Sequence, residues 1–554
     1  MQAVRIALGQ FNATVGDLAA NVAKMKTLWA DAVAAGADVV AFPELAVCGY
    51  PPEDLVYNKQ FLQDTRAAVE ELAAACPEKT IVVGFVEGTN SELYNSAAVL
   101  QKGRIVNTYH KTLLPNTSVF DEQRYFRPGG RPLIFELAGL RVALTICQDL
   151  WDETWLAGFF AGAGRIDLML NISASPFHVN KIFTRCQVIA KCTDILGCAV
   201  AYANLIGGQD ELVFDGRSIL ADSTGKIVTK AKAFEEDLLL ADIQADKSGV
   251  QIRPMQPPAP QPESPVAEIY QALVLGTRDY ALKNGFKQVL IGISGGIDSA
   301  VTAAVAAAAL GCENVQCVTM PSRFNSPETI ADAKQVTDNL GCPLLTIPIE
   351  PILKQFNESL RAEARWNGRG LAYENLQARI RGMLLMSLSN QTGALVLTTG
   401  NKSETSVGYS TLYGDMAGGF AVIKDVLKTT VYELAEHINR RAAREVIPVS
   451  VIRRIPSAEL RPNQKDSDSL PEYDLLDRII TGYVEQDRSA RELVESGLPA
   501  EVVERVIWLI DRNEYKRRQS PPGVRITTKA FGKDRRLPIT NHYTTMLTGR
   551  KGHV

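Results

Sequence analysis

The stretch "IGISGGIDSA", residues 291–300, decides the fold of the second half of the chain. An apolar strand leads into two adjacent glycines, and the alanine-rich helix "SAVTAAVAAAALG" follows at once. Glycines let backbone N–H groups turn into one concavity, and a helix N-terminus adds partial positive charge there. The lysine of a Walker A loop is missing, whereas Asp298 stands where a magnesium ion could join it to phosphate oxygens. The stretch therefore predicts a strand, a pyrophosphate-binding loop and a helix.

Outward from this loop, helices and strands alternate from about residue 266 onward. The segment 264–285 has the pattern of a helix that ends at a glycine. Fully apolar strands that alternate with helices are typical of a parallel, doubly wound sheet. We therefore expect one such domain over residues 266–554, with strands within 288–294, 314–322, 344–350 and 394–401.

The first half of the chain has a different pattern. Residues 1–246 alternate short β-rich runs with amphipathic stretches, and "DSTGKIV" at 222–228 is a hairpin signal with glycine at the turn. This pattern predicts an α/β domain with mixed sheets. The Pro- and Gln-rich stretch "QIRPMQPPAPQPESP" has little to bury, so we expect residues 247–265 to form an extended linker.

Composition limits the class of protein. The chain has 554 residues and a net charge of -3, which does not suggest a basic surface for nucleic acid. The N-terminal sequence lacks the pattern of a signal peptide, and apolar runs stay below the roughly 18 residues of a membrane span. The nine cysteines contain no CxxC pair. We expect a cytoplasmic protein with no nucleic-acid partner, no membrane partner and no structural zinc.

The glycine loop resembles that of the N-type ATP pyrophosphatases, also called adenine-nucleotide α-hydrolases. Within that group, "LVLTTGNKSETSVGYSTLYGDMAGGF" at 395–420 resembles the NAD synthetase family. The resemblance implies that ATP is a co-substrate, that Mg²⁺ is held by Asp298 and Glu404, and that deamido-NAD contacts Asn375, Glu404 and Lys516. It implies an ATP site made of Gly292, Ile293, Ser294, Gly295, Gly296, Ile297, Asp298, Ser299, Thr399, Lys428 and Ser457.

Cys147, in "VALTICQDLW" at 142–151, is ambiguous by itself, because free cysteine is among the most buried residue types. A synthetase that consumes ammonia needs a source of it, and a thiol nucleophile that attacks glutamine would supply one. A cysteine nucleophile also needs a base and a group that stabilises the oxyanion. The sequence alone does not show which residues these would be.

Three segments supply those groups by resemblance: "AFPELAVCGYPPEDL", "YHKTLLPN" and "ICQDLW" resemble the nitrilase, or carbon–nitrogen hydrolase, family. The resemblance implies an α-β-β-α sandwich with Glu44 as general base, Lys111 at the oxyanion and Cys147 as nucleophile. Gln148 stands where an acid often follows the nucleophile, so the mode of glutamine binding stays open. The expected glutamine contacts are Thr117, Ser175 and Lys181.

Together the resemblances imply amidation of deamido-NAD to NAD through an adenylate, with ammonia released from glutamine. They also imply a homo-oligomer of at least two chains. Two alternatives stay open: glutamine-dependent amidation of another carboxylate, and a scaffold built from two inactive enzyme folds. The intact residues of both motif sets argue against the scaffold. The polar segment 459–474 is either a lid over the substrate or a surface loop.

Overall fold

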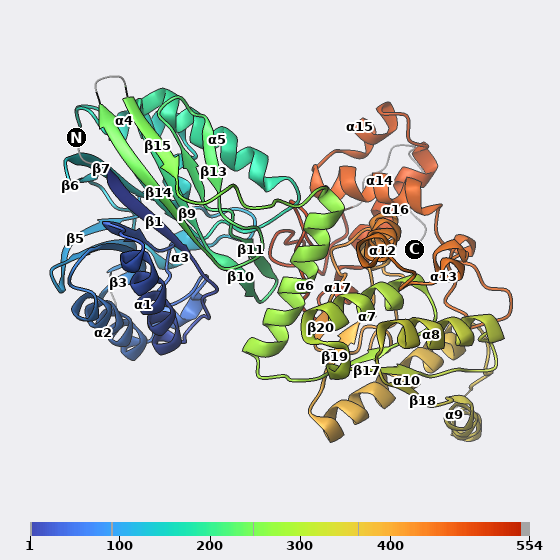
Figure 1. Cartoon of the computed structure of the whole chain (residues 1–554). Coiled ribbons are helices and arrows are strands. Elements are labelled where there is room, and N and C mark those ends of the chain that lie inside the picture. The colour runs from blue at the N-terminus through green and yellow to red at the C-terminus, as the bar shows by residue number, and fades with distance from the viewer. Residues whose placement is uncertain (1–2, 90–91, 247–248, 364, 544–554) are drawn as a thin grey trace. The chain divides into compact units, whose positions relative to one another are not determined.

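The structure is a computed structural model that describes residues 3–89, 92–246, 249–363 and 365–543. The chain divides into two compact units at Glu263 and Ser264 (Figure 1). Each unit has its own sheets and its own core, so each is described by itself. Among the described residues, we find no helix with both the length and the apolar character needed to cross a membrane.

The first unit contains two large sheets. The seven-stranded sheet has the order β15-β14-β1-β2-β3-β4-β5, and the six-stranded sheet has the order β13-β12-β9-β8-β7-β6. The strands of the first are β1 (Val4–Gln10), β2 (Val39–Ala41), β3 (Thr80–Thr89), β4 (Glu92–Gln101), β5 (Arg104–His110), β14 (Asp237–Asp246) and β15 (Gly249–Pro254). Those of the second are β6 (Leu133–Leu137), β7 (Leu140–Ile146), β8 (Leu168–Ser173), β9 (Ala199–Asn204), β12 (Ile219–Ala221) and β13 (Ile227–Lys230). A separate hairpin pairs β10 (Ile206–Gln209) with β11 (Leu212–Asp215).

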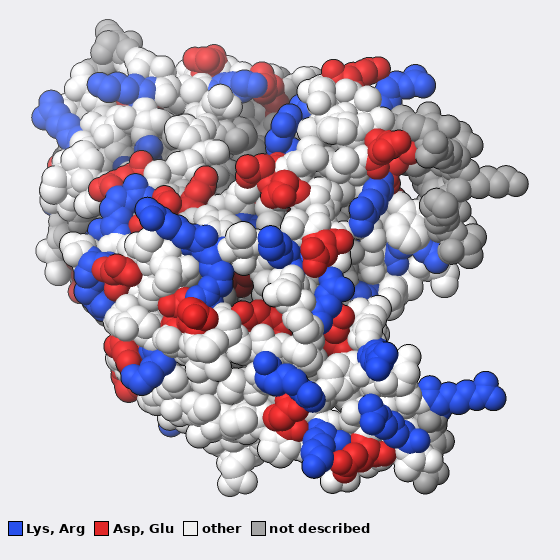
Figure 2. All heavy atoms as spheres, turned by 90° about the vertical axis from the view of Figure 1, so that its right-hand side faces the viewer, with Lys and Arg blue, Asp and Glu red and all other residues white. Residues whose placement is uncertain are grey.

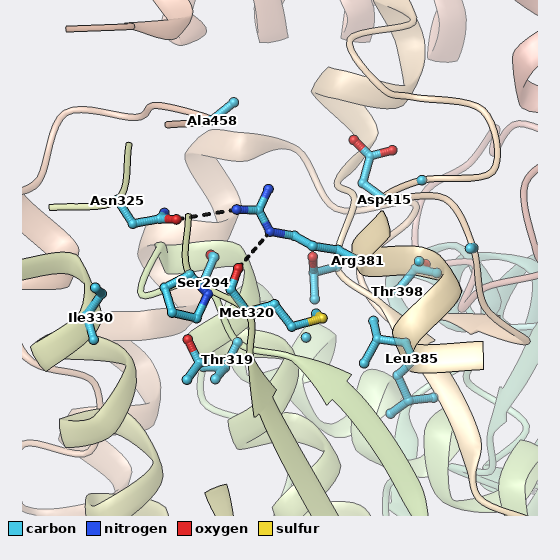
Figure 3. Close-up of a pocket in the computed structure, with 18 residues that line it drawn as sticks. Ser294, Thr319, Met320, Asn325, Ile330, Arg381, Leu385, Thr398, Asp415 and Ala458 are labelled. Atoms are coloured by element: carbon cyan, nitrogen blue, oxygen red, sulfur yellow. Dashed lines mark hydrogen bonds between the residues drawn. The ribbon is translucent and has the colours of Figure 1, made fainter. Parts of the chain in front are cut away.

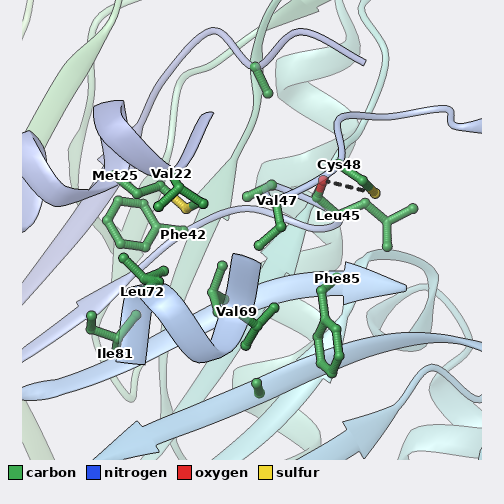
Figure 4. Packing of buried hydrophobic residues seen from close by; sticks show 14 of the residues in the cluster. Val22, Met25, Phe42, Leu45, Val47, Cys48, Val69, Leu72, Ile81 and Phe85 are labelled. Atoms are coloured by element: carbon green, nitrogen blue, oxygen red, sulfur yellow. Dashed lines mark hydrogen bonds between the residues drawn. The ribbon is translucent and has the colours of Figure 1, made fainter. Parts of the chain in front are cut away.

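Apolar side chains fill three layers of this unit. One core lies between the two sheets and includes Ile6 and Leu144. A second lies between the seven-stranded sheet and the helices α1 (Leu18–Ala34) and α2 (Lys59–Ala75), where Met25, Phe42 and Leu72 pack together (Figure 4). A third lies under α4 (Glu153–Phe159) and α5 (Lys181–Leu196). The layers are those of an α-β-β-α sandwich, as predicted.

The expected linker differs from the structure at its first half. Residues Gly249–Pro254 form β15, which pairs with β14 in antiparallel register, with Ile243 opposite Ile252. Val250 and Ile252 are buried, while Gln251 and Arg253, the residues that follow each of them, are exposed. This alternation with a period of two residues is that of an edge strand, and Pro254 ends it. The high Pro and Gln content of the following residues hid the strand from the composition-based prediction.

The second unit is built on a parallel sheet with the order β18-β17-β16-β19-β20. Its strands are β16 (Val289–Gly292), β17 (Val315–Thr319), β18 (Leu344–Thr346), β19 (Leu395–Thr398) and β20 (Phe420–Ala421). Helices α9 (Glu350–Glu363) and α10 (Gly370–Thr392) share a core with Leu290, Val318 and Val396. Helix α7 (Ile297–Leu310) packs on β16 and β17 beside α6 (Pro265–Lys283) and α12 (Lys428–Ala442). Helices therefore cover both faces of the sheet, and the doubly wound prediction is confirmed (Figure 1).

Shorter elements complete the second unit. A C-terminal helical cluster has its own core, which includes Leu476, Val484 and Ile507. On the face drawn in Figure 2, basic and acidic side chains are interspersed, in keeping with the small net charge.

The other described helices and short helical turns are distributed over both units. They are α3 (Glu122–Tyr125), α8 (Pro327–Leu340), α11 (Lys402–Val407), α13 (Val449–Arg453), α14 (Tyr473–Ile480), α15 (Ala490–Glu495), α16 (Ala500–Arg512), α17 (Glu514–Arg517), η1 (Glu53–Tyr57), η2 (Cys147–Leu150), η3 (Cys312–Asn314), η4 (Asp466–Asp468) and η5 (Thr481–Glu485).

Candidate active sites

Glu44 lies in the loop that follows β2 and is fully buried. The loop runs against β3 at Gly84, where an added Cβ would lie 2.2 Å from the backbone nitrogen of Leu45. Glycine is therefore required for this close approach. The Glu44 carboxylate accepts hydrogen bonds from Asn95 Nδ2 at 2.8 Å and from the Ala174 N–H at 2.8 Å. Its orientation is thus held from both large sheets.

Lys111 directly follows β5, and its side chain is buried. Its Nζ donates to Glu44 Oε1 at 2.7 Å and to Glu122 Oε1 at 2.7 Å. Burial alone would lower the pKa of Lys111, but the carboxylates of Glu122 and Glu44 raise it above its ordinary value. Lys111 is therefore an ammonium ion at neutral pH, bound to two carboxylates.

Cys147 directly follows β7, at the turn into η2. Its φ is +44°, in the left-handed region that non-glycine residues rarely adopt. The thiol is buried and interacts electrostatically with Glu44 and Lys111. Burial and the Glu44 charge raise its pKa, while Lys111 opposes that rise. The cysteine is therefore a thiol at rest, and it needs a neighbouring base to become a nucleophile.

The three expected glutamine contacts have different surroundings. Ser175 is buried and accepts a hydrogen bond from Arg185 Nε at 3.2 Å. Lys181, at the start of α5, holds its Nζ 4.1 Å from the ring centre of Trp151. Thr117 is exposed in the loop between β5 and α3. Ser175 alone of these three is part of the buried interior, and all three glutamine contacts remain predictions.

Glu122 joins the cluster around Lys111, and the sequence did not reveal it. It begins the four-residue helix α3, and its Oε1 accepts from both Lys111 Nζ and the Tyr50 hydroxyl, the latter at 2.8 Å. Burial raises the pKa of Glu122 to about 7, with Glu44 adding to the rise and Lys111 opposing it. The resemblance to the nitrilases suggested Glu44, Lys111 and Cys147, but no motif pointed to this second carboxylate.

The glycine loop of the second unit lies between β16 and α7. Gly295 has a φ of +85°, and an added Cβ would lie 2.1 Å from the Thr329 carbonyl oxygen of α8. Ser294 Oγ accepts the Gly296 N–H at 3.1 Å, and Ser299 Oγ donates to the Gly296 carbonyl at 2.9 Å. These bonds fix the loop at the N-terminus of α7, and a helix N-terminus is a place where backbone N–H groups can bind an anion.

Asp298, Glu404 and Lys428 lie together beside this loop. Lys428 Nζ donates to Asp298 Oδ2 and lies 3.5 Å from Glu404 Oε1. Asn401 Nδ2 donates to the other oxygen of Asp298 at 2.9 Å. Burial and the nearby Asp298 charge raise the pKa of Glu404 to about 8, and Lys428 opposes the rise. The two carboxylates thus already face one cation, the lysine ammonium.

Three adjoining cavities of about 180 Å³ each surround the loop, and Ser294 and Asp415 line all three. Thr399 lines the first and third, whereas Lys428 and Ser457 line the second. The Ser457 hydroxyl donates to the Gln464 carbonyl at 2.6 Å. The structure therefore places Ser294, Thr399, Lys428 and Ser457 on cavities that share lining residues.

Arg381 projects into the first cavity and was not singled out from the sequence (Figure 3). Its Nε donates to the Met320 carbonyl at 3.0 Å, and Nη2 donates to Asn325 Oδ1 at 3.3 Å. Burial lowers the pKa of Arg381 to about 10. It is the second arginine of "ARIRG" on α10, and the spacing of that helix gave no sign that it faces a cavity.

The residues expected at deamido-NAD lie on either side of the loop 408–415. Asn375 Oδ1 accepts from the Thr411 hydroxyl at 2.8 Å. Lys516 Nζ donates to the carbonyls of Gly408 and Ser410 at 2.7 and 2.9 Å, and it lines a fourth cavity of about 590 Å³. Asn375 and Lys516, which lie far apart in the sequence, therefore both bind the loop 408–415.

The polar segment 459–474 lies against the same space in the structure. Asp466 is buried, lines the second cavity and accepts from the Tyr473 hydroxyl at 2.8 Å. The Leu460 carbonyl accepts from Gln377 Nε2 at 2.9 Å. The segment thus contributes to the wall of the site. Opening as a lid remains a prediction.

Comparison with known proteins matches each unit to a family. Residues 5–252 match the carbon-nitrogen hydrolase family, and residues 269–520 match the NAD synthase family. The chain is 41% identical to the glutamine-dependent NAD(+) synthetase of Thermotoga maritima, over 98% of this chain and 99% of that one. It is 44% identical to the protein of the same name from Aquifex aeolicus, over 98% and 100%. The chain belongs to the glutamine-dependent NAD(+) synthetase family.

Solved structures agree with this membership. The glutamine-dependent NAD+ synthetase of Acinetobacter baumannii, solved with adenosine diphosphate, is 41% identical over 98% of this chain and 99% of that one, with a TM-score of 0.77. A second structure, from Cytophaga hutchinsonii, has a TM-score of 0.82 at 22% identity, over 98% of each chain, and it shows the shared fold. Both domains of the family are therefore present in this chain, in the same order.

Proposed function

We propose that the protein converts deamido-NAD to NAD by ATP-dependent amidation, with ammonia that it releases from glutamine. The products are NAD, AMP, pyrophosphate and glutamate. Membership of the family supports the overall reaction. The observation that carries the assignment of residues is the buried cluster in which Lys111 Nζ binds Glu44 beside the Cys147 thiol.

The glutaminase steps follow from that cluster. Glu44 takes the thiol proton, and Cys147 Sγ attacks the carbon of the glutamine carboxamide. The Lys111 ammonium stabilises the negative oxygen of the tetrahedral intermediate. Glu44 returns the proton to the leaving nitrogen, and ammonia departs. Water then hydrolyses the thioester, which releases glutamate and the free thiol. Thr117, Ser175 and Lys181 are the proposed contacts of the glutamine α-groups.

The synthetase steps belong to the second unit. The loop from Ser294 to Ser299, with Lys428, binds the phosphates of ATP. The nicotinate carboxylate of deamido-NAD attacks the α-phosphorus, so an adenylate forms and pyrophosphate leaves. Ammonia then attacks the carboxyl carbon of the adenylate, and AMP leaves. Because these are displacements on bound substrates, the protein contributes mainly position and charge neutralisation. Thr399 and Ser457 are proposed at ATP, and Asn375 and Lys516 at deamido-NAD.

Asp298 and Glu404 fit a magnesium ion. Among the described residues there is no group of three or more side chains of the metal-binding type. Magnesium needs no such group, because it is commonly held by one or two carboxylates, substrate phosphates and water. The two carboxylates already share one cation in the structure, the ammonium of Lys428. When bound, the ion would neutralise charge on the phosphates of ATP.

Two further expectations belong to the same proposal. We expect a homo-oligomer of at least two chains. We also expect the protein to act in the cytoplasm, where its nine free cysteines would stay reduced. Sedimentation of the purified protein would show the first, and imaging of a tagged chain would show the second.

A substrate screen tests the proposal. The protein is incubated with deamido-NAD, ATP, Mg²⁺ and glutamine, and NAD, AMP, pyrophosphate and glutamate are quantified. We expect NAD, AMP and pyrophosphate in equal amounts. A panel of other carboxylates is assayed in parallel for glutamine-dependent release of AMP. If another carboxylate releases AMP and deamido-NAD does not, the substrate assignment is wrong.

A further inference from the structure

Asp149 has no role in the steps above, yet it lies two residues after the nucleophile and is fully buried. Its Oδ1 accepts the backbone N–H groups of Thr112 and Leu113 at 3.1 and 2.8 Å. Its Oδ2 accepts the Ile146 N–H at 3.0 Å and the Tyr109 hydroxyl at 2.8 Å. Each carboxylate oxygen therefore accepts two hydrogen bonds, and the carboxylate itself is fully buried.

The four donors lie in or directly after strands of the two large sheets. Tyr109 lies in β5 of the seven-stranded sheet, and Thr112 and Leu113 directly follow Lys111. Ile146 ends β7 of the six-stranded sheet and directly precedes Cys147. The Asp149 side chain thus binds the chain on both sides of Lys111, at Tyr109 and at Thr112 and Leu113. It also binds the backbone just before Cys147, at Ile146.

We propose that Asp149 is a positioning residue that fixes Lys111 relative to Cys147. This inference rests on the proposed roles of Lys111 and Cys147. Asp149 does not touch the reacting atoms in this account. It sets the separation between the ammonium and the thiol by joining the chain segments that carry them. A displacement of about 1 Å in such a pair can cost on the order of 100-fold in rate.

The chemistry of the site requires a carboxylate at this position. Four donors converge on two oxygens, and an ionised carboxylate offers only acceptors. An asparagine of the same shape would keep one acceptor oxygen and turn its N–H₂ group toward two of the donors. Burial raises the pKa of Asp149 to about 6, with hydrogen bonds from Leu113 and Ile146 opposing the rise, so the group is ionised at neutral pH. The carboxylate also helps to hold the left-handed backbone of Cys147, since it binds the residue just before it.

The main test is Asp149→Asn in the full-length chain. We expect glutamine hydrolysis to fall by on the order of 100-fold, mainly in kcat. Ammonia-driven NAD formation should stay at the wild-type rate, because it uses only the second unit. The second readout is the rate of Cys147 alkylation by iodoacetamide at a fixed pH of about 8, followed by peptide mass spectrometry. Lys111 lowers the thiol pKa, so its displacement should leave less thiolate and slow the alkylation.

Two further variants separate positioning from folding. Tyr109→Phe removes one of the four hydrogen bonds and keeps the charge, so we expect a loss of roughly fivefold in glutamine hydrolysis. Asp167→Asn is the matched control, because Asp167 is also buried and accepts from the Arg141 N–H at 2.9 Å and Arg165 Nε at 2.8 Å. It lies at the other end of the parallel strands, just before β8. We expect this control to lower the Tm and to leave the alkylation rate unchanged.

The outcomes distinguish this inference from the proposed function. If Asp149→Asn keeps the wild-type hydrolysis rate and alkylation rate, Asp149 does not position the pair. If Asp167→Asn slows the alkylation equally, the effect of Asp149 is general destabilisation and the inference is wrong. If Cys147→Ala still hydrolyses glutamine, the proposed function itself is wrong, whatever Asp149 does.

Discussion

At the scale of single residues, one ammonium ion serves two carboxylates. Lys111 Nζ binds both Glu44 and Glu122 at 2.7 Å, and none of the three side chains is more than 5% exposed. Removing a charge from such a group leaves the others uncompensated, which is more costly than losing an exposed ion pair. The function of the site and the stability of the first unit therefore depend on the same contacts.

Glu122→Gln should change how the stability of the first unit depends on pH. The folded-state pKa of about 7 is above the ordinary value of a glutamate, so the folded state binds this proton more tightly than the unfolded state. The stabilisation of the folded state by this proton is fully present below about pH 4, and it is lost as the pH rises through 7. We expect the difference between the Tm of the wild type and the Tm of Glu122→Gln to decrease as the pH rises from 5 to 8. A constant difference in Tm across this range would contradict the assigned pKa shift.

The sequence revealed the residues that stand in recognisable motifs and missed those that reach the site through packing. The resemblances suggested Glu44, Lys111, Cys147 and the loop from Ser294 to Ser299, and the structure brings each set together. Glu122 binds Lys111 from the short helix α3, and Arg381 lines its cavity from the long helix α10. Which side of each helix faces inward is decided by contacts far apart in the sequence.

At the scale of elements, the spacing of apolar residues predicted the sheets well. Buried strands are apolar throughout, whereas amphipathic helices repeat their apolar residues every three or four positions. The strand β15 was missed because its alternation covers only Val250 and Ile252 before a Pro-rich stretch. The glycine loop was predicted correctly because its conformation depends on local residues. Gly295 is needed both for its positive φ and for its approach to α8.

Gly295→Ala should weaken ATP binding. The added methyl group would lie 2.1 Å from the Thr329 carbonyl oxygen, so either the loop or α8 must move. We expect the KM for ATP to rise at least about tenfold, which corresponds to roughly 1.4 kcal/mol. Gly285→Ala is the matched control, because Gly285 also has a positive φ, +80°, but an added Cβ meets no atom of the described residues within 4 Å. An equal rise in KM in the control would mean that backbone strain, and not the contact with α8, is responsible.

At the scale of the whole molecule, two units with separate cores carry two separate sets of reactive groups. The sequence predicted this division because the two motif sets do not overlap and a Pro-rich stretch separates them. It could not predict how the units act together, since no linear motif describes the transfer of ammonia. The two half-reactions can nevertheless be removed one at a time.

Lys428→Gln should abolish NAD formation with either nitrogen source. Lys428 is buried between Asp298 and Glu404, and its charge is proposed to neutralise ATP phosphates. We expect a loss of more than about 100-fold with glutamine and with ammonia alike. Glutamate production should continue, because the Cys147 site lies in the other unit. Normal NAD formation from ammonia in this variant would remove Lys428 from the proposed ATP site.

The most direct test of the account is Cys147→Ala, assayed for NAD formation from deamido-NAD and Mg·ATP with glutamine or with ammonia. Alanine removes the sulfur without adding bulk or charge to the buried site. We predict that glutamine-driven NAD formation disappears, while ammonia-driven formation continues at the wild-type rate. NAD formation from glutamine in this variant would contradict the account, because it would mean that ammonia is released at some other residue.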